Sequence, residues 1–327
     1  MNNLKIALSV NIVETDGLPG PMILHQGGYI MGKRCSFLIF ATVIGLLFFP
    51  FLVLSQSADI RHLETKQVMN IVKEAALMIS QKGEASFPEF RRQGSRWLHD
   101  DVYIFIIDTQ GNVIINPSRP ELEGRNQINL TDAMGKPFIK WFIMEATGYS
   151  FKSEGWSHYV WFKPGQETAS WKTSYVKYVI APSGKGYIVG SGLYDMKHER
   201  IFVIDIVDEA AELVQKDGRN AFPILRDKKG EFNYLTTYVF VIDERGVDLA
   251  NPAFPQHEGK NVLDLKGAKG KLFIQDMIAM LANKDSGWIT YMWPKPGTSK
   301  PASKETYVKK VKYGSETFYV GSGIYLE

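Results

Sequence analysis

Cysteine is almost absent from this chain, and its scarcity excludes two common ways of building a small protein or a site. Cys35 is the one cysteine in the sequence, so an intramolecular disulfide and a cysteine-based metal site are both excluded. A lipid-modified cysteine would follow the apolar segment of its leader. Cys35 instead stands at the start of an apolar run, which excludes that modification too.

The chain also lacks a dominant charge and the usual catalytic histidine patterns. Its 38 Lys and Arg nearly balance its 35 Asp and Glu, giving a net charge of +3 that provides no reason to expect nucleic-acid binding. The six histidines form no HExxH pair and no close grouping with Asp and Ser. We therefore expect no catalytic residue, no metal site and no cofactor. A catalytic group assembled only in the folded chain is the alternative.

Long hydrophobic runs are scarce, and the exception lies near the start, at residues 36–54. This uncharged run follows Lys33 and Arg34, a pattern typical of an export signal or an uncleaved membrane anchor. Ser55 and Ser57 are placed for cleavage after Ser57, whereas the length of the run is sufficient to span a bilayer. Both outcomes stay open, with a buried helix as a third reading. The basic pair predicts that everything after the run lies outside the cytoplasm, either periplasmic or at the cell surface.

What the chain does contain is an internal repeat. The segment Tyr103–Gly111 (YIFIIDTQG) returns 135 residues later as Tyr238–Gly246 (YVFVIDERG). The Gly-Ser-Gly at 190–192 returns at 321–323, after small loop deletions have shortened the offset. A period of this length marks a duplicated domain rather than a solenoid unit.

The repeat divides the chain. Residues 1–30 resemble neither a signal nor a domain, and we expect them to be a non-native or disordered extension, with the true start at Met31. The remaining expected parts are a signal peptide or membrane anchor at 31–58, a first module at 59–195 and a second module at 196–327.

Both copies predict the same order of elements. Each opens with an amphipathic helix, over 60–79 and 201–214, that stops at a glycine followed by a Phe-Pro pair. Strands are expected in the first copy at 103–108, 112–116, 156–162, 172–180 and 186–194, with a second helix over 132–147. The second copy matches them with a helix over 267–283 and closing strands at 288–293, 304–313 and 317–325. The predicted fold class is α+β, with a five-stranded antiparallel sheet in each module, as in PAS-like sensor domains.

The chain resembles the tandem Cache domain proteins, a PAS-like family of extracytoplasmic sensors. The resemblance rests on motifs that keep the same order in both copies: an Asp-x-x-Gly hairpin, Glu-Gly-[Arg/Lys]-Asn, Gly-Trp-x-x-Tyr-x-Trp before Pro-Gly, Lys-x-x-Tyr-Val-Lys and Val-Gly-Ser-Gly-[Leu/Ile]-Tyr. It covers nearly everything from residue 59 to 327. It implies recognition of a small molecule, an organic acid or amino acid, in a pocket on one sheet face.

Alternation along the strands indicates which side chains would line that pocket. Two amphipathic aromatic residues and a cation on one face suit a small carboxylate, because the rings supply walls and donors while the cation neutralises the anion. The candidate ligand-binding residues are Tyr159, Trp161, Lys163, Lys172, Tyr175 and Arg125 in the first copy and Tyr291, Trp293, Lys295, Lys304 and Tyr307 in the second. The alternative is that the tryptophans are core residues and the cations are solvated.

The two copies also differ. His158 corresponds to Thr290, Asp132 to Gly267, and the pair Ser118-Arg119 to Ala253-Phe254. These differences predict either that the two pockets prefer different ligands or that one pocket has become structural.

No second membrane segment or signalling domain follows Glu327 in this sequence. We therefore expect a sensor that binds a small carboxylate and acts through a membrane signalling partner. The alternative is a structural or assembly subunit of a cell-envelope complex, one that uses the same scaffold without a ligand.

Overall fold

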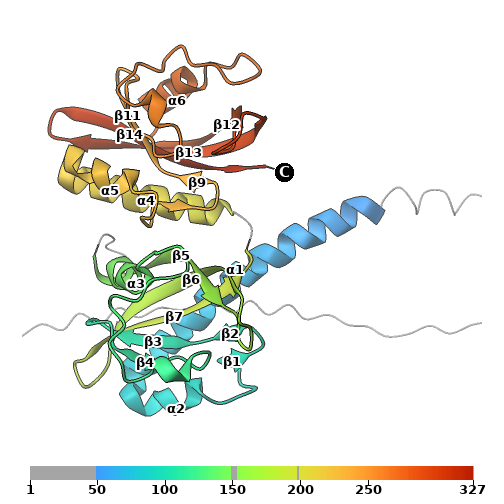
Figure 1. Ribbon diagram of the computed structural model, residues 1–327, viewed down its shortest axis with the longest axis vertical. Helices are drawn as coiled ribbons and strands as arrows, with labels where there is room; N and C mark the ends of the chain where they lie inside the picture. The colour runs from blue at the N-terminus through green and yellow to red at the C-terminus, as the bar shows by residue number, and fades with distance from the viewer. Residues whose placement is uncertain (1–48, 149–152, 197–198, 327) are drawn as a thin grey trace, which may run out of the picture. The chain divides into compact units, whose positions relative to one another are not determined.

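The computed structural model describes residues 49–148, 153–196 and 199–326 (Figure 1). The expected extension at 1–30 and most of the expected signal or anchor at 31–58 lie outside these residues. Two compact units divide the chain, Met1–Leu54 and Ser55–Glu327, and both modules belong to the second unit. Within the described stretches, no helix combines the length and the apolar character needed to cross a membrane.

The predicted opening helix and its stop are both present in each module. In the first, α1 (Phe49–Lys82) extends further toward the N-terminus than expected and ends at Gly83. In the second, α4 (Arg200–Asp217) ends at Gly218. Both glycines have positive φ angles, +57° and +55°, a conformation that strains any residue with a Cβ. The Phe-Pro pairs then begin the short helices α2 (Phe87–Phe90) and α5 (Phe222–Arg226).

Each module contains the predicted five-stranded antiparallel sheet. The first has the order β4-β3-β7-β6-β5 and the second the order β11-β10-β14-β13-β12. The first sheet consists of β3 (Phe105–Asp108), β4 (Val113–Ile115), β5 (Glu154–Phe162), β6 (Ala169–Ile180) and β7 (Gly186–Tyr194). The second consists of β10 (Phe240–Asp243), β11 (Asp248–Ala250), β12 (Ser286–Pro294), β13 (Pro301–Tyr313) and β14 (Glu316–Tyr325). The shared order confirms the duplication that the repeat predicts.

Short hairpins precede both sheets and split the strand expected to begin at Tyr103. They are β1 (Leu98–His99) with β2 (Val102–Tyr103), and β8 (Asn233–Tyr234) with β9 (Thr237–Tyr238). Tyr103 and Tyr238 therefore belong to these hairpins rather than to the main sheets.

The second helix of each module starts later than predicted. It runs over Phe138–Thr147 (α3) and Phe273–Ala282 (α6), about six residues short at the N-terminal end. In the first module a turn takes those residues, because the Asp132 carboxylate accepts hydrogen bonds from the backbone N–H groups of Met134 and Lys136, both at 2.8 Å. Such a side chain offers the backbone a partner that competes with the helix.

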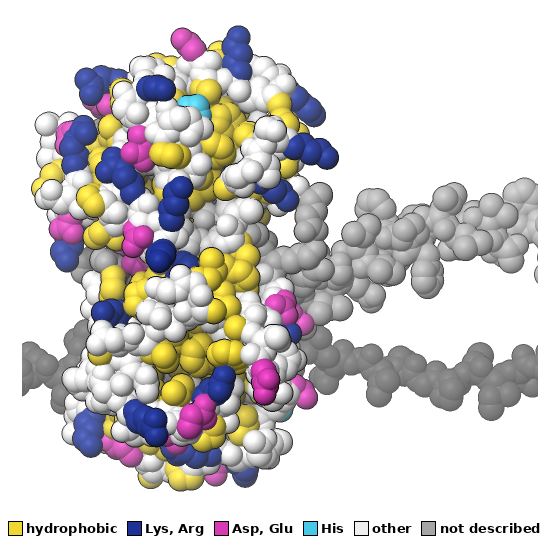
Figure 2. All heavy atoms as spheres, in the orientation of Figure 1, with side chains coloured by type: hydrophobic (Ala, Val, Ile, Leu, Met, Phe, Trp, Pro, Cys, Tyr) yellow, Lys and Arg dark blue, Asp and Glu magenta, His cyan; other side chains and the backbone are white. Residues whose placement is uncertain are grey.

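Different helices cover the two faces of each sheet. One face packs against α1 in the first module and α4 in the second, with Val72, Ile79 and Val207 fully buried. The opposite faces pack against α3 and α6, and Figure 1 shows α4 and α6 on opposite sides of the second sheet. In the face shown by Figure 2, acidic and basic side chains are interspersed around apolar patches, as the small net charge suggests.

Candidate functional site

An aromatic hollow lies between α3 and the first sheet. It has a volume of ≈ 20 Å³, and its walls include Tyr103, Phe105, Phe138, Tyr159 and Trp161. The rings support one another: Phe138 stacks on Tyr159 with centroids 4.6 Å apart and lies 4.9 Å from Trp161. The Tyr159 hydroxyl hydrogen-bonds to that of Ser174 at 3.0 Å. Tyr159 and Trp161 thus face one hollow, as strand alternation predicts for that pair.

The second module has an equivalent hollow of ≈ 30 Å³ between α6 and its sheet. Its walls include Tyr238, Phe240, Phe273, Tyr291 and Trp293. Phe273 stacks on Tyr291 at 4.1 Å, and the Tyr291 hydroxyl bonds to Thr306 at 3.0 Å. Asp248, Asn251 and His257 also line this hollow.

Lys172 lies beside the first hollow and is buried, with 1% of its surface exposed. Its Nζ is 3.9 Å from the centroid of the Tyr103 ring and 4.8 Å from that of Tyr194, and it has no hydrogen-bond partner within the described stretches. Burial lowers the pKa of Lys172, and the neighbouring Tyr103 partly offsets this shift. A buried ammonium surrounded by rings leaves its hydrogen-bonding capacity for a ligand.

Lys304 holds the same position in the second module but is hydrogen-bonded. It is fully buried, and its Nζ donates to the Tyr238 hydroxyl at 2.8 Å while lying 4.1 Å from the centroid of that ring. Burial lowers the pKa of Lys304 to about 7. Close to neutral pH, this side chain is therefore divided between its charged and neutral forms.

Tyr175 and Tyr307 lie on the faces of their sheets opposite the hollows, so they do not share a site with Tyr159 and Tyr291 as expected. Tyr159 pairs with Lys172 across the β5–β6 ladder, whereas Tyr175 pairs with Trp156 and packs in the core beneath α1. Tyr307 likewise packs 5.3 Å from Trp288. Side chains three positions apart on a strand point to opposite faces, so Lys172 and Tyr175 are separated by the sheet itself.

The remaining predicted cations also lie away from the hollows. Lys163 forms an ion pair of 2.7 Å with Asp195. Lys295 is partly exposed at a turn closed by a hydrogen bond from the Thr298 amide to its carbonyl. Arg125 is exposed in a loop. None of the three lines either hollow in the structure.

The sequence missed several residues that do line or adjoin the hollows. Tyr103 and Tyr238 open the repeat itself, and Phe138 and Phe273 start the second helix of each copy at the same offset. Their equivalent positions in the two copies are the sequence pattern that could have identified them. Ser118 has a buried hydroxyl without a hydrogen-bond partner in the parts of the chain described.

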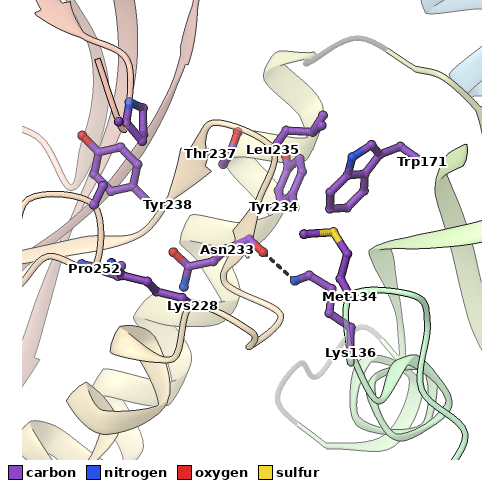
Figure 3. A pocket seen from close by; sticks show the side chains of 13 residues that line it. Met134, Lys136, Trp171, Lys228, Asn233, Tyr234, Leu235, Thr237, Tyr238 and Pro252 are labelled. Carbon is purple, nitrogen blue, oxygen red and sulfur yellow. Dashed lines mark hydrogen bonds between the residues drawn. The ribbon is translucent and has the colours of Figure 1, made fainter. Parts of the chain in front are cut away.

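A larger cleft, of ≈ 230 Å³, lies where loops of the two modules meet (Figure 3). Its main polar group, the ammonium of Lys136, already donates to the backbone carbonyls of Asn233 at 2.6 Å and Gly230 at 2.9 Å. Trp171, Leu235 and other apolar residues line the cleft together with polar ones that include Lys228, Asn233 and Thr237. We therefore place the candidate site in the aromatic hollows rather than in the larger cleft. Across the described ranges, no three His, Cys, Asp or Glu side chains are grouped to hold a metal ion.

The chain belongs to the Cache domain family, whose model matches residues 65–202 and 216–327. This match confirms the expected resemblance and identifies a tandem Cache sensor protein. Among curated proteins, the methyl-accepting chemotaxis protein McpP of Pseudomonas putida is 28% identical over 90 residues, 28% of this chain and 16% of the relative. The sensor histidine kinase MctS of Rhizobium johnstonii is 34% identical over 90 residues, 28% of this chain and 19% of the relative. The matched stretch thus spans less than a fifth of either relative.

Solved structures include similar chains. One, described as the structural basis for carboxylic acid recognition by a Cache chemosensory domain, is 24% identical, with 38% of this chain and 91% of that chain covered and a TM-score of 0.34. Another is the ligand-binding domain of the Pseudomonas aeruginosa amino acid chemoreceptor PctC with GABA. It is 13% identical, with 85% of this chain and 98% of that chain covered and a TM-score of 0.31.

Proposed function

We propose that this chain is the ligand-sensing part of an extracytoplasmic signalling system and that its first module binds a small organic acid. The observation that carries the proposal is the buried ammonium of Lys172, unpartnered within the described residues and next to an aromatic hollow. Burying a cation without a partner is costly, and a carboxylate offsets that cost through a charge-assisted hydrogen bond. Similarity to a chemotaxis protein and a sensor histidine kinase supports the signalling role.

In the proposed site, each side chain has a separate role. Lys172 neutralises the carboxylate, and the hydroxyls of Tyr103 and Ser118 donate hydrogen bonds to it. Tyr159 and Trp161 form the apolar walls that accept the hydrocarbon part of the ligand. Tyr175, Lys163 and Arg125 have no role in this site, because they lie on the other face of the sheet or outside the hollow.

The size of the hollow adds a mechanical requirement. A volume of ≈ 20 Å³ accommodates about one water molecule, which occupies roughly 10–15 Å³ on the same measure. A carboxylate of several heavy atoms therefore enters only if the rings move apart. Binding would in this way be coupled to a change of shape between α3 and the sheet, which is what a sensor needs to report its ligand.

Thermal unfolding of the full-length chain with a series of organic acids, from acetate to succinate, tests this proposal. A ligand present at about 100 times its dissociation constant should stabilise the fold by about 2.7 kcal/mol. Lys172→Met should abolish that stabilisation. Lys163→Met removes the same charge at a site outside the hollow and should retain it. Equal stabilisation of wild type and Lys172→Met by the same acid would refute the proposed site.

The nearly filled hollows favour a second candidate function, a structural subunit of a cell-envelope complex that uses the Cache scaffold without a ligand. In that case no organic acid or amino acid should stabilise the chain. A partner protein should instead co-purify with it from its native membrane fraction in fixed stoichiometry.

A further inference from the structure

Exposed apolar side chains line the cleft of ≈ 230 Å³ where the two modules meet. Met134 is 51% exposed and Leu235 is 48% exposed, and Trp171 is partly exposed. Figure 3 shows Met134 and Trp171 of the first module facing Tyr234 and Leu235 of the second. Apolar groups that gather at one hollow of the surface, instead of being scattered singly, mark a place where something binds.

The other copy of the repeat has polar residues at the same positions. The pairs of equivalent residues are Met134 and Lys269, Trp171 and Ser303, and Leu235 and Asp100. Because the copies share one fold, that fold does not need an apolar side chain at any of the three positions. The three apolar residues line a single cleft, which indicates that the cleft rather than the fold requires them.

The backbone of Leu235 supports the same conclusion. Leu235 lies in the turn between β8 and β9 with a φ angle of +49°, and Asp100 lies in the equivalent turn with a φ angle of +48°. Aspartate tolerates this left-handed conformation, whereas it strains a leucine. A leucine that is strained and half-exposed does not help the folded chain by itself, and such residues gather at functional sites.

The size and the polar groups of the cleft indicate what it would bind. Its volume has room for roughly 15 to 20 water-sized groups, far more than either hollow. Two cations, Lys136 and Lys228, line it, and no Asp or Glu is among its lining residues in the described part of the chain. Lys136 already donates two hydrogen bonds to backbone carbonyls, so the exposed Lys228 is the cation that a ligand can reach.

Aromatic rings supply the remaining walls. Trp171 lies on the side of the first module, and the Tyr234 ring of the second is held in place by a stack on His158 at 3.7 Å. A wall that is fixed before binding costs a ligand little ordering. Rings, exposed apolar side chains and an accessible ammonium together suit a ligand with an aromatic ring and a negative charge.

We propose that the cleft is a ligand site distinct from the two hollows and that it binds an aromatic carboxylate. Trp171 and Leu235 contact the ring, and Lys228 pairs with the carboxylate. The inference goes beyond the proposed function, which concerns the hollow of the first module. Because residues of both modules line the cleft, its ligand favours one arrangement of the modules over others. The ligand also meets Tyr238, which lines the second hollow as well.

Calorimetric titration of the full-length chain with benzoate, phenylacetate and indole-3-acetate tests this inference. The carboxamide of the best binder keeps the ring without the charge and should bind about 5-fold more weakly. Leu235→Asp, which copies Asp100, removes an apolar contact and adds a repelling charge, so it should weaken the acid about 10-fold or more. Leu77→Asp is the matched control, because Leu77 is 56% exposed in α1 and does not line the cleft.

Thermal unfolding of the same variant separates binding from folding. Leu235→Asp should unfold at the wild-type temperature or above it, because aspartate suits the turn. If this variant is instead less stable than wild type, Leu235 holds the modules together and the inference fails. It fails too if none of the three acids binds, or if Leu235→Asp binds them as tightly as wild type.

One further variant distinguishes this inference from the proposed function. An aromatic acid that Lys172→Met loses and Leu235→Asp retains binds in the first hollow, which would overturn the site in the cleft and support the proposed function. An aromatic acid that Leu235→Asp loses and Leu77→Asp retains binds in the cleft. That result stands whether or not the organic acids tested on the first hollow bind.

Discussion

The two modules share their framework and differ in their charges. Both stack a phenylalanine on a tyrosine in nearly parallel planes, at 3° for Phe138 and Tyr159 and 4° for Phe273 and Tyr291. Both tie that tyrosine to a hydroxyl on the neighbouring strand at 3.0 Å. The differences include charged groups and also apolar ones, since Phe142 of the first hollow corresponds to Met277, which is buried in the core of the second module. Duplication has thus kept the stacked pair of rings and its hydroxyl partner and changed residues around them.

One position near the hollows has a cation in the first module and an aromatic ring in the second. In the first module the guanidinium of Arg119 lies 4.3 Å from the centroid of the Phe162 ring. In the second module Phe254 holds the equivalent position and packs 5.5 Å from Trp293 and 5.8 Å from Tyr238. A cation in the first module is therefore replaced by a ring that packs against Tyr238 and Trp293, two walls of the second hollow.

The largest expected effect is the change in the free energy of unfolding when a buried lysine is replaced, and it should differ between Lys304 and Lys172. The unfolded chain retains the Lys304 proton up to about pH 10.5, whereas the folded chain releases it at about pH 7. Between these values the unfolded state binds more protons, so the free energy of unfolding rises with pH. Lys304→Met removes this term and should stabilise the chain by about 2–4 kcal/mol at pH 6, with little effect at pH 10.5.

Chemical denaturation across this pH range measures that effect. Lys172→Met should act in the same direction, because burial also lowers the pKa of Lys172. Its pKa is held up by Tyr103, so the two variants should give different pH profiles. A destabilised Lys304→Met at pH 6 would contradict the account of Lys304 as a buried, costly cation.

An intermediate effect tests how closely the two frameworks match. A Cβ on Gly192 would lie 2.4 Å from the carbonyl oxygen of Thr173, and a Cβ on Gly323 would lie 2.4 Å from that of Glu305. Because both oxygens are backbone atoms of a paired strand, Gly192→Ala and Gly323→Ala should each destabilise the chain by about 1–3 kcal/mol. Thermal unfolding of each variant measures this. Tolerance of alanine at just one of them would show that the sheets are packed differently.

The sequence was sufficient to predict the fold because the fold depends on repeated, short-range patterns. Amphipathic spacing located α1 and α4, and Gly83 and Gly218 marked their ends through the one conformation that glycine adopts without strain. The helix predicted to begin at Asp132 begins later, at Phe138. The Asp132 carboxylate accepts backbone hydrogen bonds that stabilise a turn instead, and hydrophobic periodicity does not detect such a turn.

The site was predictable only within a strand. Alternation correctly joined Tyr159 with Trp161, but it does not give the phase of a neighbouring strand, so Tyr175 of β6 was expected at the same site as Tyr159 of β5 although the sheet separates them. The burial of Asp248 was not predictable from the sequence, because an acidic residue just after a turn is usually solvated. Its burial, which matches that of Val113 at the equivalent position, is visible only in the folded chain.

The smallest expected effect concerns a position where the modules again differ in charge, Glu145 in α3 and Met280 in α6. Both side chains lie against a strand glycine, Gly155 and Gly287 respectively.

Glu145 is buried next to Glu209 of α4, and burial raises the pKa of both carboxyls well above 4.5. Above about pH 4.5 the unfolded chain releases protons that the folded chain retains to higher pH, so stability falls as pH rises. Glu145→Gln supplies a permanent donor to Glu209 and should raise the free energy of unfolding by about 1 kcal/mol at pH 8. At pH 4 the same substitution should have almost no effect. Urea denaturation at the two pH values measures the difference, and an equal effect at both would show that the two carboxyls do not share a proton.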